Sequence, residues 1–250
     1  MCNVTGIAFG EAVLTKPMIA GRDVLEVGSL DVNGSLRPYV ESLGPARYVG
    51  VDIAPGPRVD EVLDASKLVE RFGADAFDVV LTTEMVEHIR DWRTVVRNLK
   101  RVVRPGGMLL VTTRSIGFPY HGYPYDFWRY EPEDMRAIFG DFEIVALERD
   151  TDAPGVFMLA HKPKAFTEKL APVALFSIVS HRRRAEISSI DILRFRLARR
   201  ARADAQAASR RAAKGLRRAP RIVRQRLVSP TWRRLPAPVR SGVKRVLRRA

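Results

Sequence analysis

The apolar residues of the first 162 positions fall into short runs separated by amphipathic segments. Runs rich in β-branched residues predict strands at 23–28, 47–53, 58–64, 77–83, 107–113, 142–149 and 155–162. Apolar residues spaced three or four apart predict helices at 34–43, 65–73, 91–104 and 131–139. Strands that alternate with helices are typical of an α/β fold, so we expect a mostly parallel sheet with helices on both faces.

Proline and glycine residues mark the ends of the predicted helices. Pro38 and Pro132 fit the first turns of two of them, because a first-turn residue needs no backbone N–H. Gly73 is placed to end a third helix, and Pro105 begins the Pro-Gly-Gly sequence that ends a fourth.

The charge divides the chain into two parts. The whole sequence has 43 Lys and Arg against 28 Asp and Glu, a net charge of +15. Up to residue 160 there are 17 basic and 24 acidic residues, whereas the remainder has 26 basic and 4 acidic ones. The strand pattern ends at about the same place. We therefore predict a sheet-containing domain at 1–162 and an Arg-rich, helical or partly disordered tail at 163–250. The helical pieces of the tail are expected to be interrupted at Gly215, Pro220, Pro230, Pro236 and Pro238.

The tail has three candidate roles. Its basic amphipathic segments favour attachment of residues 181–250 to an anionic membrane surface. The same charge could neutralise the phosphates of a nucleic acid, but Phe195 and Trp232 are the main aromatics there, so base stacking is less favoured. The third possibility is a solvated appendage without a partner.

Other features of the sequence bear on the compartment. Cys2 is the only cysteine, which excludes an internal disulfide and a cysteine-based metal cluster. The N-terminus lacks the basic and apolar blocks of a secretory signal, and the longest apolar run, 171–179, is too short to span a bilayer. We expect a cytoplasmic protein, peripheral at the inner face of the membrane if the tail binds lipid.

Candidate ligand-binding residues follow the first three predicted strands. Gly28 ends the first strand, Asp52 ends the second and Asp64 ends the third. Ligands of doubly wound sheets bind at the carboxyl ends of strands, near the switch in strand order. The loop after Gly28 lacks the Gly-x-Gly-x-x-Gly spacing of a dinucleotide site, because Leu30 stands at the second glycine and the next bend falls at Asn33-Gly34.

Together with "FDVVLTTEMVEHI" and "LKRVVRPGGMLLVTT", these residues resemble the class I S-adenosylmethionine-dependent methyltransferases over about residues 20–162. The resemblance implies a Rossmann-like, seven-stranded, mostly parallel sheet and S-adenosylmethionine as cofactor. By the same likeness, Glu26 would hold the amino group of the methionine moiety, Asp52 would bind ribose, and a side chain near Asp64 would meet adenine. The full set of expected cofactor residues is Glu26, Gly28, Ser29, Asp52, Ile53, Asp64, Ala65, Thr83 and Glu84.

A possible metal site follows the fourth strand. Glu84, Glu87 and His88 have i, i+3 and i+4 spacing, which places them on one face if the segment is helical. This pattern resembles that of small-RNA 3′-terminal 2′-O-methyltransferases and polyprenyl-catechol O-methyltransferases, where it binds a divalent ion. With Asp126 as a fourth ligand, the set would suit Mg or Mn. Without a metal, His88 would be a hydrogen-bonded part of the pocket wall.

The segment 117–133 is rich in aromatic residues and also carries His121, Asp126 and Arg129. As a loop after the fifth strand, it would form an acceptor site in which His121, His88 or Asp126 removes a proton. The alternative is a lid packed on its own aromatics, with Asp126 and Arg129 as a local ion pair.

These observations predict an S-adenosylmethionine-dependent methyltransferase that acts on a hydroxyl group. The aromatic loop resembles that of methyltransferases found with bacterial polysaccharide and glycolipid pathways, which implies a sugar or glycolipid-precursor acceptor. Two alternatives stay open: an RNA 2′-O-methyltransferase, and a non-catalytic methyltransferase-like module that binds a membrane or a polyanion.

Overall fold

A computed structural model describes residues 3–122 and 125–218. The chain divides into two compact units, Met1–Asp191 and Ile192–Ala250, which we describe separately. The first unit contains all the strands of the described residues, and the second contains most of the last helix.

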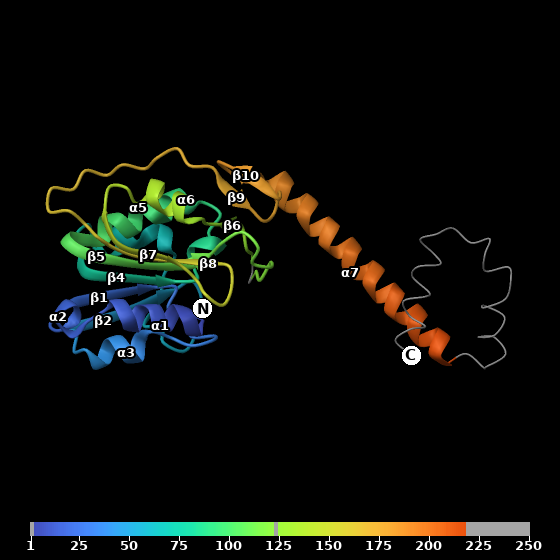
Figure 1. Cartoon of the computed structure of the whole chain (residues 1–250), viewed down its shortest axis with the longest axis horizontal. Helices are drawn as coiled ribbons and strands as arrows, with labels where there is room; N and C mark the ends of the chain where they lie inside the picture. Colours follow the sequence, from blue (N-terminus) through green and yellow to red (C-terminus); the bar gives the residue numbers. More distant parts are fainter. Residues whose placement is uncertain (1–2, 123–124, 219–250) are drawn as a thin grey trace. The chain divides into compact units, whose positions relative to one another are not determined.

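The first unit is built on a seven-stranded sheet with the order β3-β2-β1-β4-β5-β8-β7 (Figure 1). Its strands are β1 Asp23–Val27, β2 Arg47–Asp52, β3 Glu61–Val62, β4 Phe77–Thr83, β5 Val103–Arg114, β7 Glu143–Arg149 and β8 Gly155–His161. Among them, β8 runs antiparallel to both of its neighbours, and the pairs among β1 to β5 are parallel. The predicted fold class is therefore confirmed.

Helices cover both faces of the sheet. They are α1 Val4–Val13, α2 Lys16–Ile19, α3 Arg37–Ser42, α4 Leu68–Phe72, α5 Trp92–Val102 and α6 Pro132–Ile138, with 3₁₀ turns η1 Ala65–Lys67 and η2 Val86–His88. In Figure 1, α1 and α3 lie on one side of the sheet, and α5 and α6 lie on the other. Phe9 of α1 and Val40 of α3 share a buried core with Val79, Leu81 and Leu110, which are alternate positions of β4 and β5.

The helix ends follow the prolines, with one shift. Pro38 and Pro132 lie in the first turns of α3 and α6, and α4 ends just before Gly73, as predicted. The helix predicted at 91–104 instead ends at Val102, because Val103 already pairs with Phe77 at the start of β5. Helices α1 and α2 were not predicted, since their sequences lack a clear polar face.

The first unit extends beyond the predicted boundary at residue 162. Strands β6 Trp128–Arg129, β9 Leu175–Ser177 and β10 Arg182–Arg184 form a second sheet in the order β10-β9-β6. The side chain of Arg93 also donates to the carbonyls of Val173 and Ala185. Residues 163–191 thus pack on the domain instead of belonging to the tail.

The last described element is α7, Ser189–Arg218, a helix of 30 residues. It confirms the helical part of the predicted tail and continues through Gly215, where an interruption was predicted. The expected breaks at Pro220, Pro230, Pro236 and Pro238 lie outside the described residues, as does Trp232. None of the described helices is both long and apolar enough to cross a membrane.

We predict that Leu175→Ala lowers the free energy of unfolding by about 2–5 kcal/mol, because it leaves a cavity at a fully buried position of β9. Leu193→Ala is the matched control, since the side chain of Leu193 on α7 is 56% exposed and its truncation should change stability by less than about 0.5 kcal/mol. Urea unfolding of both variants measures the difference. Equal, small effects would mean that residues 163–191 do not stabilise the domain.

Candidate active site

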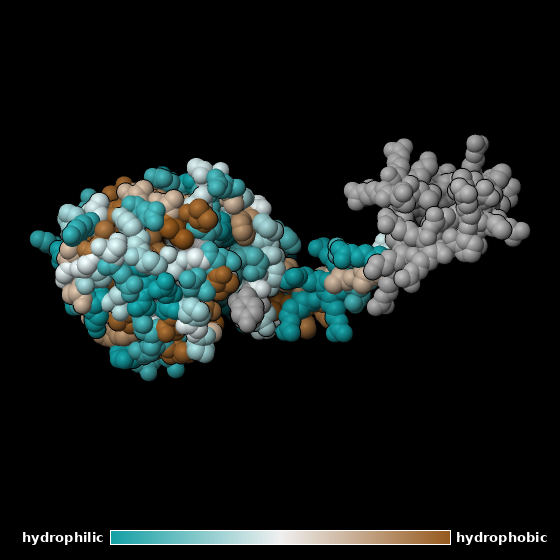
Figure 2. All heavy atoms as spheres, turned by 90° about the horizontal axis from the view of Figure 1, so that it is seen from below, coloured by the Kyte–Doolittle hydropathy of each residue, from teal (hydrophilic) through white to brown (hydrophobic). Residues whose placement is uncertain are grey.

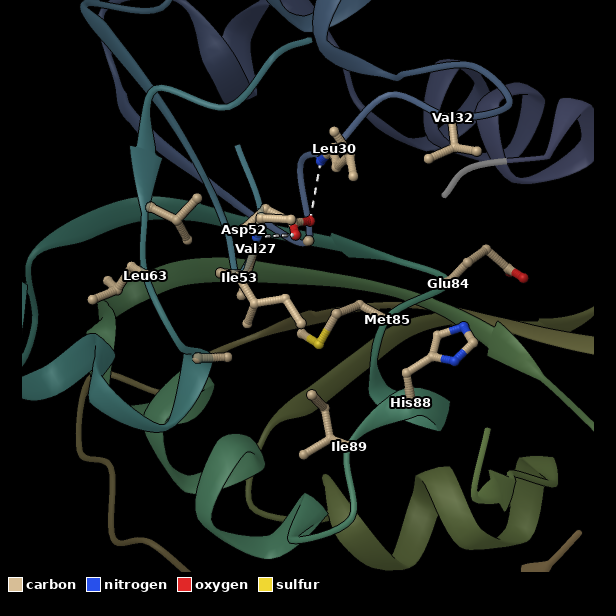
Figure 3. A pocket seen from close by; sticks show the side chains of 14 residues that line it. Val27, Leu30, Val32, Asp52, Ile53, Leu63, Glu84, Met85, His88 and Ile89 are labelled. Carbon is tan, nitrogen blue, oxygen red and sulfur yellow. Dashed lines mark hydrogen bonds between the residues drawn. The ribbon is translucent and has the colours of Figure 1, made fainter. Parts of the chain in front are cut away.

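A pocket of about 200 Å³ opens at the carboxyl ends of β1, β2 and β4 (Figure 3). Its wall consists of Val27, Gly28, Leu30, Val32, Val51, Asp52, Ile53, Ala54, Leu63, Ala65, Glu84, Met85, His88 and Ile89. Strands β1 and β4 are neighbours, although β2 and β3 lie between them in the sequence. The pocket therefore lies at the switch in strand order, where doubly wound sheets bind ligands.

The loop after β1 is a wide turn held by hydrogen bonds. Gly28 has a φ of +82°, and a Cβ added there would lie 2.8 Å from Cβ and Cγ of Met85. Glycine is thus required for the backbone conformation and for the close approach of Met85. The side chain of Asp31 accepts a hydrogen bond from the backbone N–H of Gly34 (3.0 Å), and Gly34 has a φ of +121°, so the later bend uses a glycine outside the usual spacing.

Asp52 lies in the pocket wall at the end of β2. Its carboxylate accepts hydrogen bonds from the backbone N–H groups of Leu30 (3.2 Å) and Ala54 (3.1 Å). The side chain therefore shapes the loops after β1 and β2, and its remaining lone pairs can accept the two hydroxyls of a ribose.

Glu26, which is expected to hold the amino group of the cofactor, is not among the residues that line the pocket, although its neighbour Val27 is. Val27 lines the pocket, and the preceding residue of a strand points to the opposite face. The hydroxyl of Tyr48 donates to Glu26 Oε2 (2.8 Å). Burial raises the pKa of Glu26 to about 7, although the bond from Tyr48 acts against this rise.

Three more predicted cofactor residues lie outside the pocket lining. Asp64 is exposed, and its side chain accepts from the backbone N–H of Ser66 (2.8 Å) at the start of η1. Ser29 and Thr83 are buried at the ends of their strands. In contrast, Gly28, Asp52, Ile53, Ala65 and Glu84 do line the pocket, together with apolar residues that the resemblance had not indicated, such as Leu30 and Leu63.

The spacing had predicted that Glu84 shares a helical face with Glu87 and His88, but it does not. It has a φ of +53°, and the 3₁₀ turn η2 begins only at Val86. The buried carboxylate of Glu84 pairs with Arg114 instead. Burial, followed by the charge of Glu87, raises the pKa of Glu84 to about 8, and Arg114 opposes this rise. Glu84 is therefore a poor partner of Glu87 in a common metal site.

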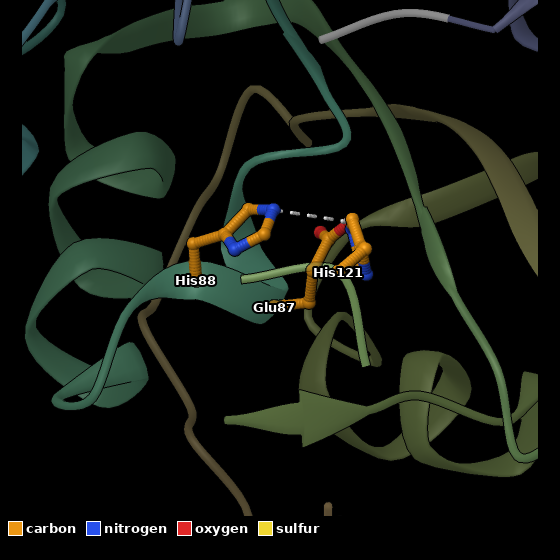
Figure 4. A group of neighbouring side chains, drawn as sticks. All are labelled: Glu87, His88 and His121. Carbon is orange, nitrogen blue, oxygen red and sulfur yellow. Dashed lines mark ion pairs between the residues drawn. The ribbon is translucent and has the colours of Figure 1, made fainter. Parts of the chain in front are cut away.

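The side chains of Glu87, His88 and His121 meet in a compact cluster (Figure 4). One potential ligand atom from each lies within 4.8 Å of the other two. Glu87 is fully buried, and its Oε1 lies 4.0 Å from His88 Nε2 and 3.6 Å from His121 Nε2. Sequence spacing had joined His88 to Glu87 but could not show that His121, 33 positions further on, returns to the same place.

The two histidines are oriented by acceptors on their other ring nitrogen. His88 Nδ1 lies 2.6 Å from the carbonyl oxygen of Tyr125, which can only accept, so Nδ1 carries the proton and neutral His88 has its lone pair on Nε2. His121 Nδ1 lies 2.9 Å from Asp126 Oδ2. Neither Glu87 Oε1 nor His88 Nε2 has a hydrogen-bond partner among the described residues.

This donor set fits a divalent cation. Two imidazoles and a carboxylate are the mixed ligands of such ions, and anchoring of Nδ1 is typical of histidines that ligate through Nε2. The predicted ligands were Glu84, Glu87, His88 and Asp126, whereas the cluster consists of Glu87, His88 and His121.

Asp126 is buried in an ion pair with Arg129, the alternative that the sequence had left open. Arg129 Nη1 and Nη2 donate to the two carboxylate oxygens at 2.5 and 2.7 Å. Burial alone would raise the pKa of Asp126, but the bonds from Arg129 and His121 outweigh burial and hold this pKa well below its usual value. Asp126 thus positions His121 and is too weak a base to remove a proton.

His121 and Glu87 are an oppositely charged pair in the absence of a metal. Burial opposes the charge of His121, but Asp126 and Glu87 outweigh it and raise the pKa of His121 to about 9. Burial would likewise raise the pKa of Glu87, yet the neighbouring histidines lower it. Metal-free His121 therefore keeps its proton at neutral pH, which leaves His88 as the better candidate for a general base.

The aromatic segment after β5 is only partly a lid. Phe127, Trp128 and Tyr130 are buried, so these three aromatics pack in the interior and do not form an open acceptor site. Trp128 Nε1 donates to the carbonyl of Ile89 (2.9 Å), and the hydroxyl of Tyr130 donates to that of Val86 (3.2 Å). Tyr123 lies outside the described residues.

Comparison with known proteins agrees with this geometry. Residues 25–111 match a family described as a methyltransferase domain. Residues 25–111 therefore belong to a methyltransferase domain. The match includes β1, β2, β4 and the Glu87–His88 part of the cluster, but it ends before His121.

Curated relatives of the chain include O-methyltransferases. The ubiquinone biosynthesis O-methyltransferase of Caulobacter vibrioides is 39% identical over 107 residues, which are 43% of this chain and 38% of that protein. The enzyme of the same name from Pseudomonas putida is 30% identical over 112 residues, 39% of this chain and 47% of that protein. The aligned part thus spans less than half the length of these relatives.

Among solved structures, the [4+2]-cyclase SpnF shares the fold of the methyltransferase domain. It has a TM-score of 0.50 at 18% identity and covers 64% of this chain and 80% of its own. This likeness concerns the fold alone.

We predict that the metal-free protein loses stability as the pH rises from about 6.5 to about 9. A raised pKa in the folded state means that the contribution of His121 is complete below its ordinary pKa of 6.5 and is lost as the pH rises through about 9. Urea unfolding in the presence of a chelator at several pH values measures this loss.

The variant His121→Gln should show a shallower decline than the wild type over the same range. Glu84, whose pKa rises from 4.5 to about 8, destabilises in the same direction, so the difference between the two proteins is the decisive quantity. His161→Gln on β8 is the control. Identical slopes for the wild type and His121→Gln would refute the proposed pairing with Glu87 and Asp126.

Proposed function

We propose that the chain binds S-adenosylmethionine in the pocket of Figure 3 and transfers the methyl group to a hydroxyl. The observation that carries this proposal is that His88 belongs to two features of the site at once. It lines the pocket and also belongs to the cluster with Glu87 and His121. A proton acceptor thus lies beside the space for the methyl donor. The methyltransferase domain and the O-methyltransferase relatives support the same reaction class.

The cofactor would use the polar and apolar walls of the pocket differently. Asp52 would accept the ribose hydroxyls, and the apolar side chains of Ile53 and Leu63 would flank the adenine. The pocket is smaller, at about 200 Å³, than the roughly 300–1,000 Å³ of most ligand sites. We expect Met85, an unbranched side chain packed on Gly28, to move aside when the cofactor enters.

Proton removal would fall to His88. The carbonyl of Tyr125 holds its Nδ1–H, so the Nε2 lone pair is available to the acceptor hydroxyl. The carboxylate of Glu87 would stabilise the imidazolium that forms, and Asp126 would act through the orientation of His121. In the alternative with a metal, a divalent ion held by Glu87, His88 and His121 would take the Nε2 lone pair of His88, and the ion in place of His88 would lower the pKa of the acceptor hydroxyl.

For the acceptor, we propose a hydroxyl of a sugar or glycolipid precursor, as the aromatic segment suggests. The names of the curated relatives make a hydroxyl of a ubiquinone precursor the second candidate. An RNA 2′-hydroxyl is a third, for which the E-x-x-E-H pattern and the basic tail are the supporting features. A module without catalysis would keep the fold but have no use for a base in the pocket.

We predict that Asp52→Asn weakens binding of S-adenosylhomocysteine by about 1–3 kcal/mol, because hydrogen bonds to a charged acceptor are lost. Titration calorimetry measures the affinity. Asp64→Asn is the matched control, since Asp64 is exposed and asparagine also caps a helical turn. Unchanged affinity in Asp52→Asn would refute the ribose assignment, and a wild type that binds no S-adenosylhomocysteine would favour the non-catalytic module.

We predict that methyl label from S-adenosylmethionine enters the lipid or polysaccharide fraction of a cell extract. His88→Gln should lower the rate by a factor of about 10²–10⁴, the usual contribution of a general base, whereas His161→Gln should not. Label that appears in RNA and disappears with ribonuclease would identify the acceptor as RNA instead.

The same assay with chelator tests the metal. If Glu87, His88 and His121 hold an essential divalent ion, EDTA abolishes turnover and Mg or Mn restores it, but neither ion rescues Glu87→Ala. Full activity in EDTA would leave His88 as a base that needs no metal.

A further inference from the structure

We propose that α7 docks the protein on an anionic lipid bilayer, with the helix lying in the plane of the surface. The inference concerns a separate surface and does not depend on methyl transfer. Its first basis is charge. The 30 residues of α7 contain ten Lys and Arg and two Asp, whereas residues 1–160 have 24 acidic and 17 basic residues. The helix, and not the domain, is the part attracted to a negative surface.

The second basis is an apolar stripe on the same helix. Ile190, Leu193 and Leu197 are spaced three and four residues apart, and between 56% and 60% of each is exposed. The spacing continues with Ala201, Ala205 and Ala208, and the polar residues that fall within the same arc are Arg194 and Asp204. Figure 2 shows hydrophobic side chains beside hydrophilic ones along the coloured part of this helix.

Arginines cover the remaining sides of the helix. Arg196, Arg199, Arg200 and Arg202 are all exposed and lie around the turns that carry the stripe. Long basic side chains can reach lipid headgroups while the apolar face enters the boundary with the acyl chains. The arginines of the helix therefore complement the anionic headgroups of a bilayer, and its exposed apolar side chains complement the acyl chains.

Two other occupants fit this surface less well. A nucleic acid would use the charge but leave the leucines in water, and Phe195 is the single aromatic residue of α7 for base stacking. In a helix dimer, the arginines beside the stripe would face like charges, and the stripe narrows to alanine after Leu197.

The start of α7 is fixed to the first unit. Arg90 donates to the carbonyl of Ile187 (3.0 Å) and to Oγ of Ser189 (3.3 Å), and the side chain of Ile187 is buried. The helix therefore begins from an anchored residue, so a helix bound to lipid would hold the domain at the membrane.

The experiment is sedimentation of the full-length chain with vesicles of phosphatidylglycerol and phosphatidylcholine in equal parts, at low salt. We expect the wild type to sediment with these vesicles and not with pure phosphatidylcholine. The double variant Leu193→Gln/Leu197→Gln should reduce the partition coefficient by about tenfold or more, because its apolar face is lost. Val145→Gln, which removes an equally exposed apolar side chain from β7, should bind as the wild type does.

A charge series separates lipid from other polyanions. The triple variant Arg199→Gln/Arg200→Gln/Arg202→Gln should lower vesicle binding by about a hundredfold, and the corresponding lysine variant should retain it. Unchanged urea unfolding of each variant shows that the fold is intact. The proposal is overturned if the wild type does not sediment with the anionic vesicles, or if it sediments equally with neutral ones. It is also overturned if the Leu193→Gln/Leu197→Gln variant binds vesicles as the wild type does and polyuridylate competes equally for the variant and the wild type.

Discussion

The buried ion pair between Asp126 and Arg129 is the interaction on which the candidate active site depends. It occupies both carboxylate oxygens of Asp126, whose Oδ2 also accepts from the backbone N–H of His121. Arg129 further donates to the carbonyls of Phe118 and Pro119, so one guanidinium fixes the loop from both ends. Without this pair, the loop would not hold the side chain of His121 beside Glu87. A lone charge in this place would be costly to bury, which makes the pair an all-or-none element of the site.

A second constraint keeps the two acidic residues of the E-x-x-E-H pattern apart. Glu84 and Glu87 are both buried, and two neighbouring carboxylates raise each other's pKa. The structure gives them different partners, Arg114 for Glu84 and the histidines for Glu87. The positive φ of Glu84 achieves this separation, because it turns the side chain away before η2 begins. One acid can then remain protonated while the other stays ionised beside His88.

Local patterns in the sequence were sufficient for most of the sheet but not for the site. The strand predicted at 77–83 has the same bounds as β4, since a buried parallel strand requires a continuous apolar run. The helical face assumed for Glu84 failed because spacing alone does not show a left-handed residue. His121 joins Glu87 through tertiary contacts, and Trp128 of β6 pairs with Ser177 of β9, 49 positions further on, so neither could be predicted from local periodicity.

The fold also leaves the chemistry open, since a [4+2]-cyclase has the same architecture. What distinguishes this chain is which buried polar atoms around its pocket have hydrogen-bond partners and which do not. Most ionisable side chains around the pocket have a partner: Arg114 pairs with Glu84, Arg129 pairs with Asp126, and backbone N–H groups donate to Asp52. Several buried polar atoms near the pocket have no hydrogen-bond partner among the described residues, and they include Glu84 Oε1, Glu87 Oε1, His88 Nε2 and His121 Nε2. Buried polar atoms are rarely left unpaired unless a ligand, an ion or a reacting group completes them. Glu87 Oε1 lies 4.0 Å from His88 Nε2, and His88 lines the pocket, which is why we propose an acceptor hydroxyl or a metal ion as the partner of these atoms.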